Sequence, residues 1–454
     1  MMPLAEAARV LDGKLTGPDA TFEAVGTDSR SLVPGQLFVA LRGDKFDGHD
    51  YVADVLARGA AGALVNADWA AEHGAGLPLV AVEDTRAALG RLAAAWRRRF
   101  AIPVIGVTGS NGKTTVKEMI AAILAAEHGA DRRLATSGNF NNDIGLPLTL
   151  LRLRAEHRAA VIEIGMNHPG ETSQLAAICS PTVALVNNAQ REHQEFMKSV
   201  AAVAEEHGAV IAGLAADGAA VINADDEFAD YWRRLAGARA VWDFGFDFPA
   251  AVTAGCRVEP DGLSLDMATP AGRTGVRLAV IGLHNARNAL AATAASLAAG
   301  ASLDAVRRGL ESFRPVKGRL QLKAGIGGAA IIDDTYNANP DSVGAAIDVL
   351  ASFPGRRILV LGDMGEVGDK AGQYHDEVGG RAKSMGLERL LALGDHAAAA
   401  AHNFGEGAAH FGRIEELIEA LRPELHEGVT VLVKGSRFMR MERVVQAVTE
   451  QEEH

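Results

Sequence analysis

Short apolar runs alternate with longer amphipathic stretches through the middle of the chain. The runs at 102–107, 159–165, 182–188 and 219–223 are rich in valine, isoleucine and alanine, and each is too short to form a helix by itself. We expect each of them to form a buried strand. The stretches between them have helical periodicity, the first of them at 114–128. Strands that alternate with helices in this way predict parallel βαβ units within one sheet.

The same alternation starts again towards the end of the sequence. Its apolar runs at 329–337, 356–366, 389–395 and 429–437 predict a second set of buried strands, with helical stretches between them. This part of the sequence contains no G-x-G-x-x-G fingerprint of a dinucleotide-binding fold. Because strands and helices alternate again, we nevertheless expect residues 314–454 to form a separate Rossmann-like domain.

The beginning of the chain predicts a smaller α/β unit, with short apolar runs such as the one at 37–41. The pattern at 84–100 starts with a capping Asp or Thr and predicts a helix that carries the chain into the next domain. Ligands are expected at the carboxyl ends of the strands and between domains. The expected fold class is α/β with three domains: a small domain at 1–83, a central parallel-sheet domain at 84–313 and the Rossmann-like domain at 314–454.

Composition narrows the classes of function. With 454 residues, 48% hydrophobic and 22% charged, the chain is typical of a soluble globular protein. A net charge of -12 argues against a nucleic-acid partner, because binding a phosphate backbone requires clustered cations. The sequence has two cysteines, no recognisable signal peptide and no apolar run long enough to span a bilayer. We expect a cytoplasmic monomer that acts on small molecules.

A glycine-rich turn follows the strand at 102–107 and opens a helix. The strict phosphate-loop pattern G-x-x-x-x-G-K-[ST] fails, because its first glycine would fall at Val107. The physics of phosphate binding is retained, since backbone N–H groups of the turn can face phosphates, Lys113 can bridge outer oxygens and Thr114 can ligate Mg²⁺. The alternative is an ordinary αβ turn, which a Gly-Lys-Thr-Thr exit from a buried strand makes the weaker interpretation. The expected phosphate site comprises Gly109, Ser110, Asn111, Gly112, Lys113, Thr114 and Thr115.

Two further strands of the central domain end in residues that can bind a cation. Glu163 stands at the end of the strand at 159–165, and His193 follows the strand at 182–188. Carboxylate oxygen and imidazole nitrogen could complete a Mg²⁺ site beside the phosphates. Each residue also has an ordinary alternative, a buried hydrogen-bonded Glu or a surface His. Two such residues in one phosphate-loop domain favour the metal site.

Two groups of polar residues remain open to more than one interpretation. Asn285 and Asn288 lie three apart at a helix start, where asparagines often serve as caps, although carboxamides also bind adenine edges. A second group follows the first strand of the last domain and represents either turn chemistry or a ligand site. It comprises Arg319, Asp334, Tyr336, Asn337 and Asn339.

Taken in order, the motifs TGSNGKTT, EIG, REHQEF, HNARN, GRL and DDTYNANPDS resemble those of the Mur ligases, the ATP-dependent amide ligases of peptidoglycan precursor synthesis. TDSR, GNFNNDIGLPLTLL, LGDMGE and VLVKGSR are similar to the member that adds D-alanyl-D-alanine to UDP-N-acetylmuramoyl-tripeptide. The resemblance covers essentially the whole chain. It implies a UDP-sugar domain, a central ATPase domain and a Rossmann-like domain for ATP and the incoming amine. It also implies that ATP activates the tripeptide carboxylate as an acyl phosphate.

The resemblance also implies a role for each matching residue. Lys113 would hold the β- and γ-phosphates, and Thr114, Glu163 and His193 would ligate Mg²⁺. Arg319 would reach the phosphates from the third domain. Asn288 would contact adenine, with Asn285 ordering that helix start, and Asp334 would bind ribose. The UDP-sugar would be contacted by Ser29, Arg30, Lys45, Asn139, Asn141 and Asn142. The dipeptide would be contacted by Asn337, Asn339 and Ser342.

The sequence departs from the family pattern at one position. Many Mur ligases carry a lysine fourteen residues after the metal-site His, and its carbamate helps to hold a second Mg²⁺. Here that position is His207, which cannot form a stable carbamate. Either Glu205 or Glu206 supplies the missing carboxylate, or His193 and substrate oxygens hold the cation. We favour the second alternative, because Glu206 should point about 100° away from position 207 on a helix.

Two other functions compete with this interpretation. The first is another ligase of the superfamily, such as folylpolyglutamate synthase or the ligase that adds a diamino acid, although the Asp-Asn-Pro-Arg box of the latter is missing here. The second is a phosphate-loop switch that binds nucleotide without making a bond. Such a switch would need neither Glu163 and His193 nor an amine-binding domain.

Overall fold

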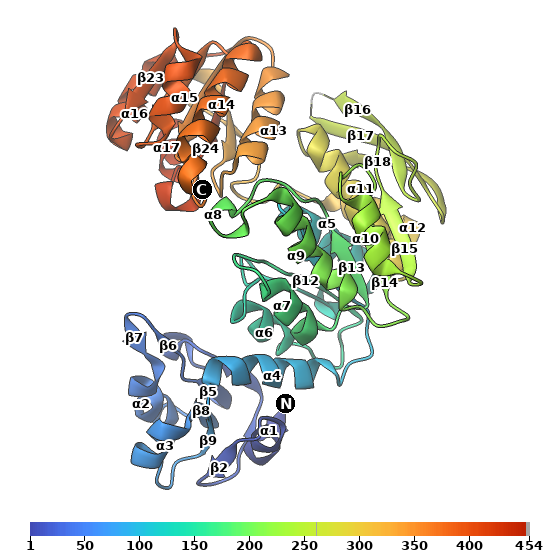
Figure 1. Cartoon of the computed structure of the whole chain (residues 1–454), viewed down its shortest axis with the longest axis vertical. Coiled ribbons are helices and arrows are strands. Elements are labelled where there is room, and N and C mark those ends of the chain that lie inside the picture. The colour runs from blue at the N-terminus through green and yellow to red at the C-terminus, as the bar shows by residue number, and fades with distance from the viewer. Residues whose placement is uncertain (260, 451–454) are drawn as a thin grey trace.

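The computed structural model describes residues 1–259 and 261–450. Three α/β domains follow one another along the long axis of the molecule, with the first at one end and the last at the other (Figure 1). The predicted α/β class with parallel sheets is confirmed. In the part of the chain that the structure describes, no helix is both long and apolar enough to cross a membrane.

The first domain is built on a small mixed sheet. Its strand order is β2-β9-β8-β5-β4, and only the β2–β9 pair is antiparallel. The strands of this sheet are β2 (Lys14–Thr16), β4 (Ala24–Gly26), β5 (Gln36–Val39), β8 (Gly62–Asn66) and β9 (Leu79–Val82). Short additional elements surround it: β1 (Met2–Pro3), α1 (Leu4–Val10), β3 (Thr21–Phe22), β6 (Arg42–Gly43), β7 (Phe46–Asp47), α2 (Val52–Ala57) and α3 (Ala67–His73).

Helix α4 (Thr85–Arg97) joins the first domain to the second. Its first turn is capped by Asp84, which accepts hydrogen bonds from the backbone N–H groups of Arg86 at 2.8 Å and Ala87 at 3.1 Å. Leu89 and Leu92 of the buried face belong to a hydrophobic core that includes residues of both domains. Because α4 packs on both sides, the proposed boundary between residues 83 and 84 stays a prediction, as does the one between 313 and 314.

The central domain contains the predicted parallel sheet. Its strand order is β11-β12-β10-β13-β14-β15, and every neighbouring pair is parallel. The strands are β10 (Val104–Thr108), β11 (Arg133–Ala135), β12 (Ala159–Glu163), β13 (Val183–Val186), β14 (Ala219–Asn223) and β15 (Ala240–Phe244). One face packs on α4, α6 (Gly145–Leu150), α7 (Glu171–Cys179), α9 (Val200–Ala212) and α10 (Ala229–Ala236), and the other on α5 (Lys113–His128) and α11 (Leu283–Ala298).

An antiparallel sheet that the sequence analysis did not anticipate covers the outer side of α11. It consists of β16 (Thr253–Glu259), β17 (Gly262–Thr269) and β18 (Gly272–Leu278). Leu263, Leu265 and Met267 of β17 alternate towards the core and are buried. Helix α11 lies between this small sheet and the central sheet, so most of its residues are buried. Its many alanines allow close packing on both sides. Helix α12 (Leu303–Ser312) packs against α5 nearby.

The third domain has the predicted doubly wound arrangement. Its strand order is β19-β20-β24-β21-β22-β23, and only the β19–β20 pair is antiparallel. The strands are β19 (Gln321–Ala324), β20 (Ala330–Asp334), β21 (Arg356–Gly362), β22 (Arg389–Leu393), β23 (Ala408–Phe411) and β24 (Val429–Lys434). One face packs on α13 (Pro340–Ala351), α14 (Ala371–Ser384) and α15 (Ala397–Phe404), and the other on α16 (Ile414–Leu421) and α17 (Glu442–Val448).

The close contact between α14 and α15 generates a stability prediction. A Cβ atom at Gly379 would lie 2.1 Å from the backbone oxygen of Ala400, whereas a Cβ at Gly372 of the same helix would meet nothing within 4 Å. We expect Gly379→Ala to lower the free energy of unfolding by about 1–3 kcal/mol, because the two backbones must separate. Gly372→Ala should leave it unchanged or raise it slightly. Urea unfolding followed by circular dichroism measures both, and equal effects would contradict the packing described.

Candidate active site

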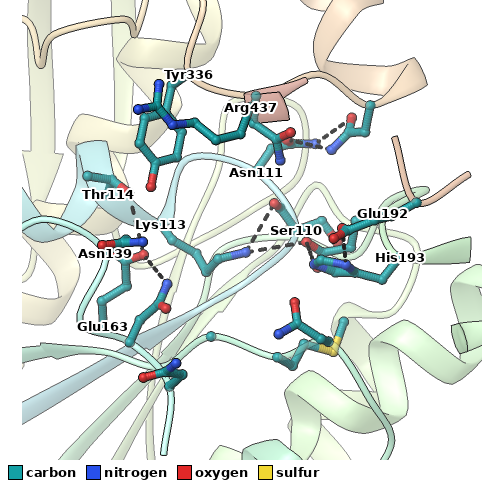
Figure 2. Close-up of a pocket in the computed structure, with 18 of the residues that line it drawn as sticks. Ser110, Asn111, Lys113, Thr114, Asn139, Glu163, Glu192, His193, Tyr336 and Arg437 are labelled. Carbon is teal, nitrogen blue, oxygen red and sulfur yellow. Dashed lines mark hydrogen bonds and ion pairs between the residues drawn. The ribbon is translucent and has the colours of Figure 1, made fainter. Parts of the chain in front are cut away.

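A cavity of about 870 Å³ lies between the central and third domains. The carboxyl ends of β10 and β12 face it from one side, and those of β20 and β24 face it from the other. Figure 2 shows that most of its lining side chains are polar. This is the location at which α/β sheets bind their ligands, and it matches the position expected from the sequence.

The glycine-rich turn passes closely under neighbouring segments. Gly109 and Gly112 have φ values of 134° and 84°, which only glycine adopts without strain. A Cβ at Gly112 would lie 2.5 Å from Asn288 Oδ1 and 2.7 Å from Asn187 Nδ2. Helix α5 starts directly after this turn, and its first-turn N–H groups have no acceptor within the helix. The turn therefore presents a helix N-terminus to the cavity, as an anion site requires.

Lys113 does not extend freely into the cavity. Its ammonium donates a hydrogen bond to the backbone oxygen of Gly109. It also donates to the backbone oxygen of Ser110 at 3.2 Å and lies 3.3 Å from Glu192 Oε2 (Figure 2). Burial alone would raise the pKa of Glu192, but the charge of Lys113 and a hydrogen bond with His207 lower it to about 2. The Glu192 carboxylate is therefore ionised and neutralises Lys113.

Glu163 has the properties of a cation ligand. Its Oε1 accepts hydrogen bonds from Asn141 Nδ2 at 2.8 Å and from Thr114 Oγ1 at 3.4 Å. Its Oε2 is buried without a hydrogen-bond partner among the described residues. A buried carboxylate oxygen without a partner beside a threonine hydroxyl fits a hard cation such as Mg²⁺. Residues 1–259 and 261–450 contain no preformed cluster of three or more His, Cys, Asp or Glu ligands, so water and phosphate oxygens would have to complete the shell.

His193 lines the same cavity and touches the third domain. Its Nδ1 lies 2.6 Å from Glu366 Oε2, and its Nε2 lies 3.8 Å from Glu192 Oε2. The ring thus lies between two carboxylates, and its Nδ1 has no hydrogen-bond partner among the described residues. The backbone of His193 is in the left-handed region, with a φ of 47°, which is uncommon outside glycine and often found at functional sites.

His207, which replaces the lysine expected from the family pattern, is fully buried on α9. Its Nδ1 lies 2.9 Å from Thr108 Oγ1, and its Nε2 lies 2.8 Å from Glu192 Oε1. Glu206 accepts hydrogen bonds from the N–H groups at the start of α7, and Glu205 is exposed. The carboxylate beside position 207 is thus Glu192, a residue that neither sequence-based alternative included. A second cation held by His193 and substrate oxygens stays a prediction.

Asn285 and Asn288 lie behind the phosphate loop and do not line the cavity. Asn285 Nδ2 donates to the backbone oxygen of Ile281 at 2.8 Å, and its Oδ1 accepts from Asn288 Nδ2 at 3.0 Å. Asn288 Oδ1 accepts from Asn187 Nδ2 at 3.1 Å. Both side chains therefore stabilise the helix start and the loop, and the contact of Asn288 with adenine stays a prediction.

The third domain contributes a polar wall to the cavity. Arg319 stacks on the Tyr336 ring, with its guanidinium carbon 4.1 Å from the ring centroid. Asp334 lies outside the cavity lining and accepts a hydrogen bond at 2.6 Å from Nζ of the buried Lys434. Burial lowers the pKa of Lys434, although the charge of Asp334 opposes this effect. The proposed contact of Asp334 with ribose stays a prediction.

Asn339 connects the third domain directly to the phosphate loop. Its Nδ2 donates to Asn111 Oδ1 at 3.0 Å, while its Oδ1 accepts from the backbone N–H of Ser342 at 2.8 Å. Asn339 and Ser342 also form a capping box at the start of α13. Residues of this segment thus cap a helix and also line the cavity, and their contact with a ligand stays a prediction. Asn337 lines the cavity as well.

A second contact between the domains lies beside the cavity. The guanidinium of Arg191 donates to Asp341 Oδ1 at 2.7 Å and to Glu377 Oε2 at 2.9 Å. These hydrogen bonds raise the pKa of Arg191. Arg191 belongs to the loop after β13, and both acidic residues belong to the third domain. The third domain is therefore docked on the phosphate-loop domain.

The residues expected to bind a UDP-sugar fall into two groups. Asn139, Asn141 and Asn142 line the cavity at the end that faces the first domain. Ser29, Arg30 and Lys45 lie on the first domain outside the cavity lining. Arg30 is exposed and pairs with its neighbour Asp28 at 2.9 Å. Within the described residues, the structure thus does not bring these two groups into one pocket.

Several residues of the site were not assigned from the sequence: Glu192, His207 as a partner of Glu192, Arg191, Glu366, Lys434 and Arg437. A signal for Glu192 was present, because an acidic residue directly precedes the His that was singled out. Lys434 and Arg437 stand within the quoted motif VLVKGSR. Their approach to the phosphate loop depends on domain docking, which no local pattern encodes.

Comparisons with known proteins agree with this architecture. Three family models match: the Mur ligase family catalytic domain at 21–97, the Mur ligase middle domain at 107–296 and the Mur ligase glutamate ligase domain at 318–437. UDP-N-acetylmuramoyl-tripeptide–D-alanyl-D-alanine ligase of Escherichia coli K12 is 42% identical over 98% of each chain. The Bacillus subtilis protein of the same name is 32% identical over 98% of this chain and 97% of its own.

Solved structures give the same result. The crystal structure of MurF from Acinetobacter baumannii superposes with a TM-score of 0.90, at 34% identity and 98% coverage of both chains. MurF ligase from Thermotoga maritima in complex with ADP superposes with a TM-score of 0.82, at 27% identity, over 94% of this chain and 96% of that one. The resemblance seen in the sequence motifs is confirmed, and the chain belongs to the Mur ligase family.

Proposed function

We propose that this chain is an ATP-dependent ligase that joins D-alanyl-D-alanine to UDP-N-acetylmuramoyl-tripeptide in peptidoglycan precursor synthesis. The name shared by the relatives from Escherichia coli and Bacillus subtilis supports this reaction. The ADP complex of the Thermotoga maritima relative supports a nucleotide as one substrate. One observation carries the proposal: the phosphate loop, Glu163 and the polar wall of the third domain line a single cavity.

The chemistry explains why such a site needs two domains. An amide does not form usefully from a carboxylate at neutral pH, because the leaving group would be oxide. ATP therefore phosphorylates the terminal carboxylate of the tripeptide, and the amine of D-alanyl-D-alanine displaces phosphate through a tetrahedral intermediate. In this proposal Lys113 and Arg319 neutralise charge on the phosphoryl group, and the docked domains hold both reactants in place. ADP and phosphate are the other products.

Mg²⁺ is part of the proposal and would neutralise the outer phosphate oxygens when bound. Thr114 and Glu163 are its proposed ligands, supported by the unpartnered Oε2 of Glu163. His193 is proposed to serve a second cation through Nε2. Asn141 orients the Glu163 carboxylate through its 2.8 Å hydrogen bond.

The remaining assignments extend the proposal to the substrates. Asn139, Asn141 and Asn142 are proposed to contact the UDP-sugar substrate, since they line the same cavity as the phosphate loop. Asn337, Asn339 and Ser342 are proposed to contact the dipeptide. The UDP-sugar substrate is also proposed to contact Ser29, Arg30 and Lys45 of the first domain. We also propose that the protein is located in the cytoplasm and is a monomer.

The amine specificity provides the direct test. With ATP, Mg²⁺ and UDP-N-acetylmuramoyl-tripeptide present, we expect ADP release only when D-alanyl-D-alanine is added. Other amines, such as diaminopimelate or glutamate, should release little. The product is identified by mass spectrometry as the pentapeptide. Nucleotide binding without substrate-dependent ADP release would instead favour a phosphate-loop switch.

Lys113→Ala should abolish ligation and leave the fold intact. The side chain lies at the start of α5 and lines a cavity, so its removal creates no core void. Loss of the cation that faces the phosphoryl group should lower turnover at least about a hundredfold. Lys198→Ala, which removes an exposed lysine outside the cavity, is the matched control. Retention of about a tenth of wild-type turnover in Lys113→Ala would refute the assigned role.

Activity should also be independent of dissolved CO₂. Both ring nitrogens of His207 are already within hydrogen-bond distance of Thr108 and Glu192, and an imidazole cannot carry the carbamate that a lysine forms. Turnover in CO₂-depleted buffer is therefore expected to equal turnover in bicarbonate buffer. Strong stimulation by bicarbonate would mean that a lysine elsewhere in the site is carbamylated.

A further inference from the structure

A chain of buried polar groups leads from the central sheet to Lys113. Thr108 Oγ1 lies 2.9 Å from His207 Nδ1, His207 Nε2 lies 2.8 Å from Glu192 Oε1, and Glu192 Oε2 lies 3.3 Å from Lys113 Nζ. Thr108 and His207 are completely buried, and Glu192 is 5% exposed. The four side chains come from β10, α9, the loop after β13 and the start of α5.

The directions of these hydrogen bonds follow from the chemistry of the groups. An ionised carboxylate only accepts hydrogen bonds, so Nε2 of His207 carries the proton that it donates to Glu192. With the proton on Nε2, the other nitrogen of the neutral tautomer is an acceptor, so this tautomer places Nδ1 as acceptor to the hydroxyl of Thr108 at 2.9 Å. This arrangement fixes the tautomer of His207, and through it the orientation of the Glu192 carboxylate, much as outer carboxylates orient metal-bound histidines.

Stability alone is a weak explanation for such a chain. Taking a carboxylate, an imidazole and an ammonium out of water is costly, and apolar side chains of similar volume often replace such groups without loss of stability. This series of hydrogen-bonded side chains also ends at Lys113, which lines the cavity, and not at a residue of the hydrophobic core. A role at the reacting site accounts for both features.

We propose that Glu192 is a positioning residue that holds the ammonium of Lys113 over the phosphate loop, and that His207 holds Glu192. This inference rests on the proposed function. A lysine side chain is a flexible stem of four carbons and carries about 2 kcal/mol of rotamer entropy. A fixed counter-ion therefore reduces the number of positions that the lysine ammonium occupies. In protein kinases a Lys–Glu ion pair orients the lysine that contacts the nucleotide phosphates, so the same physical solution exists on an unrelated fold.

Glu192→Gln tests the proposal because it keeps the shape and removes the charge. We expect the rate constant kcat to fall by about a hundredfold, as mispositioning of a reacting group does elsewhere, while KM for D-alanyl-D-alanine stays unchanged. His207→Phe should also lower kcat, but by less than Glu192→Gln does, since Glu192 keeps its pairing with Lys113. Glu205→Gln, an exposed glutamate on the helix of His207, is the matched control and should behave as wild type.

A double-mutant cycle distinguishes positioning of Lys113 from any other role. The dissociation constant of a non-hydrolysable ATP analogue with Mg²⁺ is measured for wild type, Glu192→Gln, Lys113→Ala and the double variant. In the wild-type background, Glu192→Gln should weaken binding of the analogue or leave it unchanged, because Lys113 is still present but is no longer oriented by a counter-ion. In Lys113→Ala it should strengthen binding, because an unpaired carboxylate beside the phosphates is removed. The two effects should differ by about tenfold.

Three outcomes are decisive. Equal effects of Glu192→Gln in both backgrounds would overturn the inference, since Glu192 would then act independently of Lys113. Electron paramagnetic resonance counts the Mn²⁺ ions bound to each variant. If Glu192→Gln lost one bound Mn²⁺ and also changed analogue binding equally in both backgrounds, Glu192 would be a cation ligand, and the inference would again be overturned. Failure of wild type to bind the ATP analogue would refute the proposed function itself. Urea unfolding of each variant shows that the effects come from folded protein.

Discussion

The close approach of the phosphate loop to the strand and helix ends around it is the constraint on which the site depends. Gly109 and Gly112 adopt left-handed backbone conformations, and Gly112 leaves no space for a side chain beside Asn187 and Asn288. This packing fixes the start of α5, and with it the direction of its N-terminal N–H groups and of Lys113. Asn285 and Asn288 support the loop from behind, so residues that do not line the cavity still determine its shape.

Oppositely charged side chains pair with one another in and beside the site. Lys113 is neutralised by Glu192, Arg191 by Asp341 and Glu377, and Lys434 by Asp334. Glu163 is different, because one of its oxygens is buried and finds no hydrogen-bond partner in the described chain. A counter-ion holds each paired cation in place beside the cavity, whereas the unpartnered carboxylate oxygen of Glu163 fits a cation. The site thus has separate groups for phosphate and for metal.

Docking of the third domain completes the cavity. The amide pair of Asn111 and Asn339 and the ion pairs of Arg191 connect the two domains beside the phosphate loop. Arg319, stacked on Tyr336, enters the same cavity from the third domain. These contacts are polar and partly exposed, and interfaces of this kind permit domains to move relative to each other. The first domain, by contrast, shares a hydrophobic core with the central domain through α4.

The sequence alone determined the local features of this protein. Apolar periodicity located the strands at 102–107 and 159–165 as well as the doubly wound third domain, because burial of a parallel strand demands a short apolar run. The phosphate loop followed from its glycines and Lys113, and ordered motifs indicated the family. Only the tertiary structure decided that His207 holds Glu192, that Glu192 pairs with Lys113 and that Asn339 reaches Asn111, since 79 positions separate Lys113 from Glu192 and 228 separate Asn111 from Asn339. Such contacts depend on how sheets and domains pack, and a side chain does not encode its distant partner.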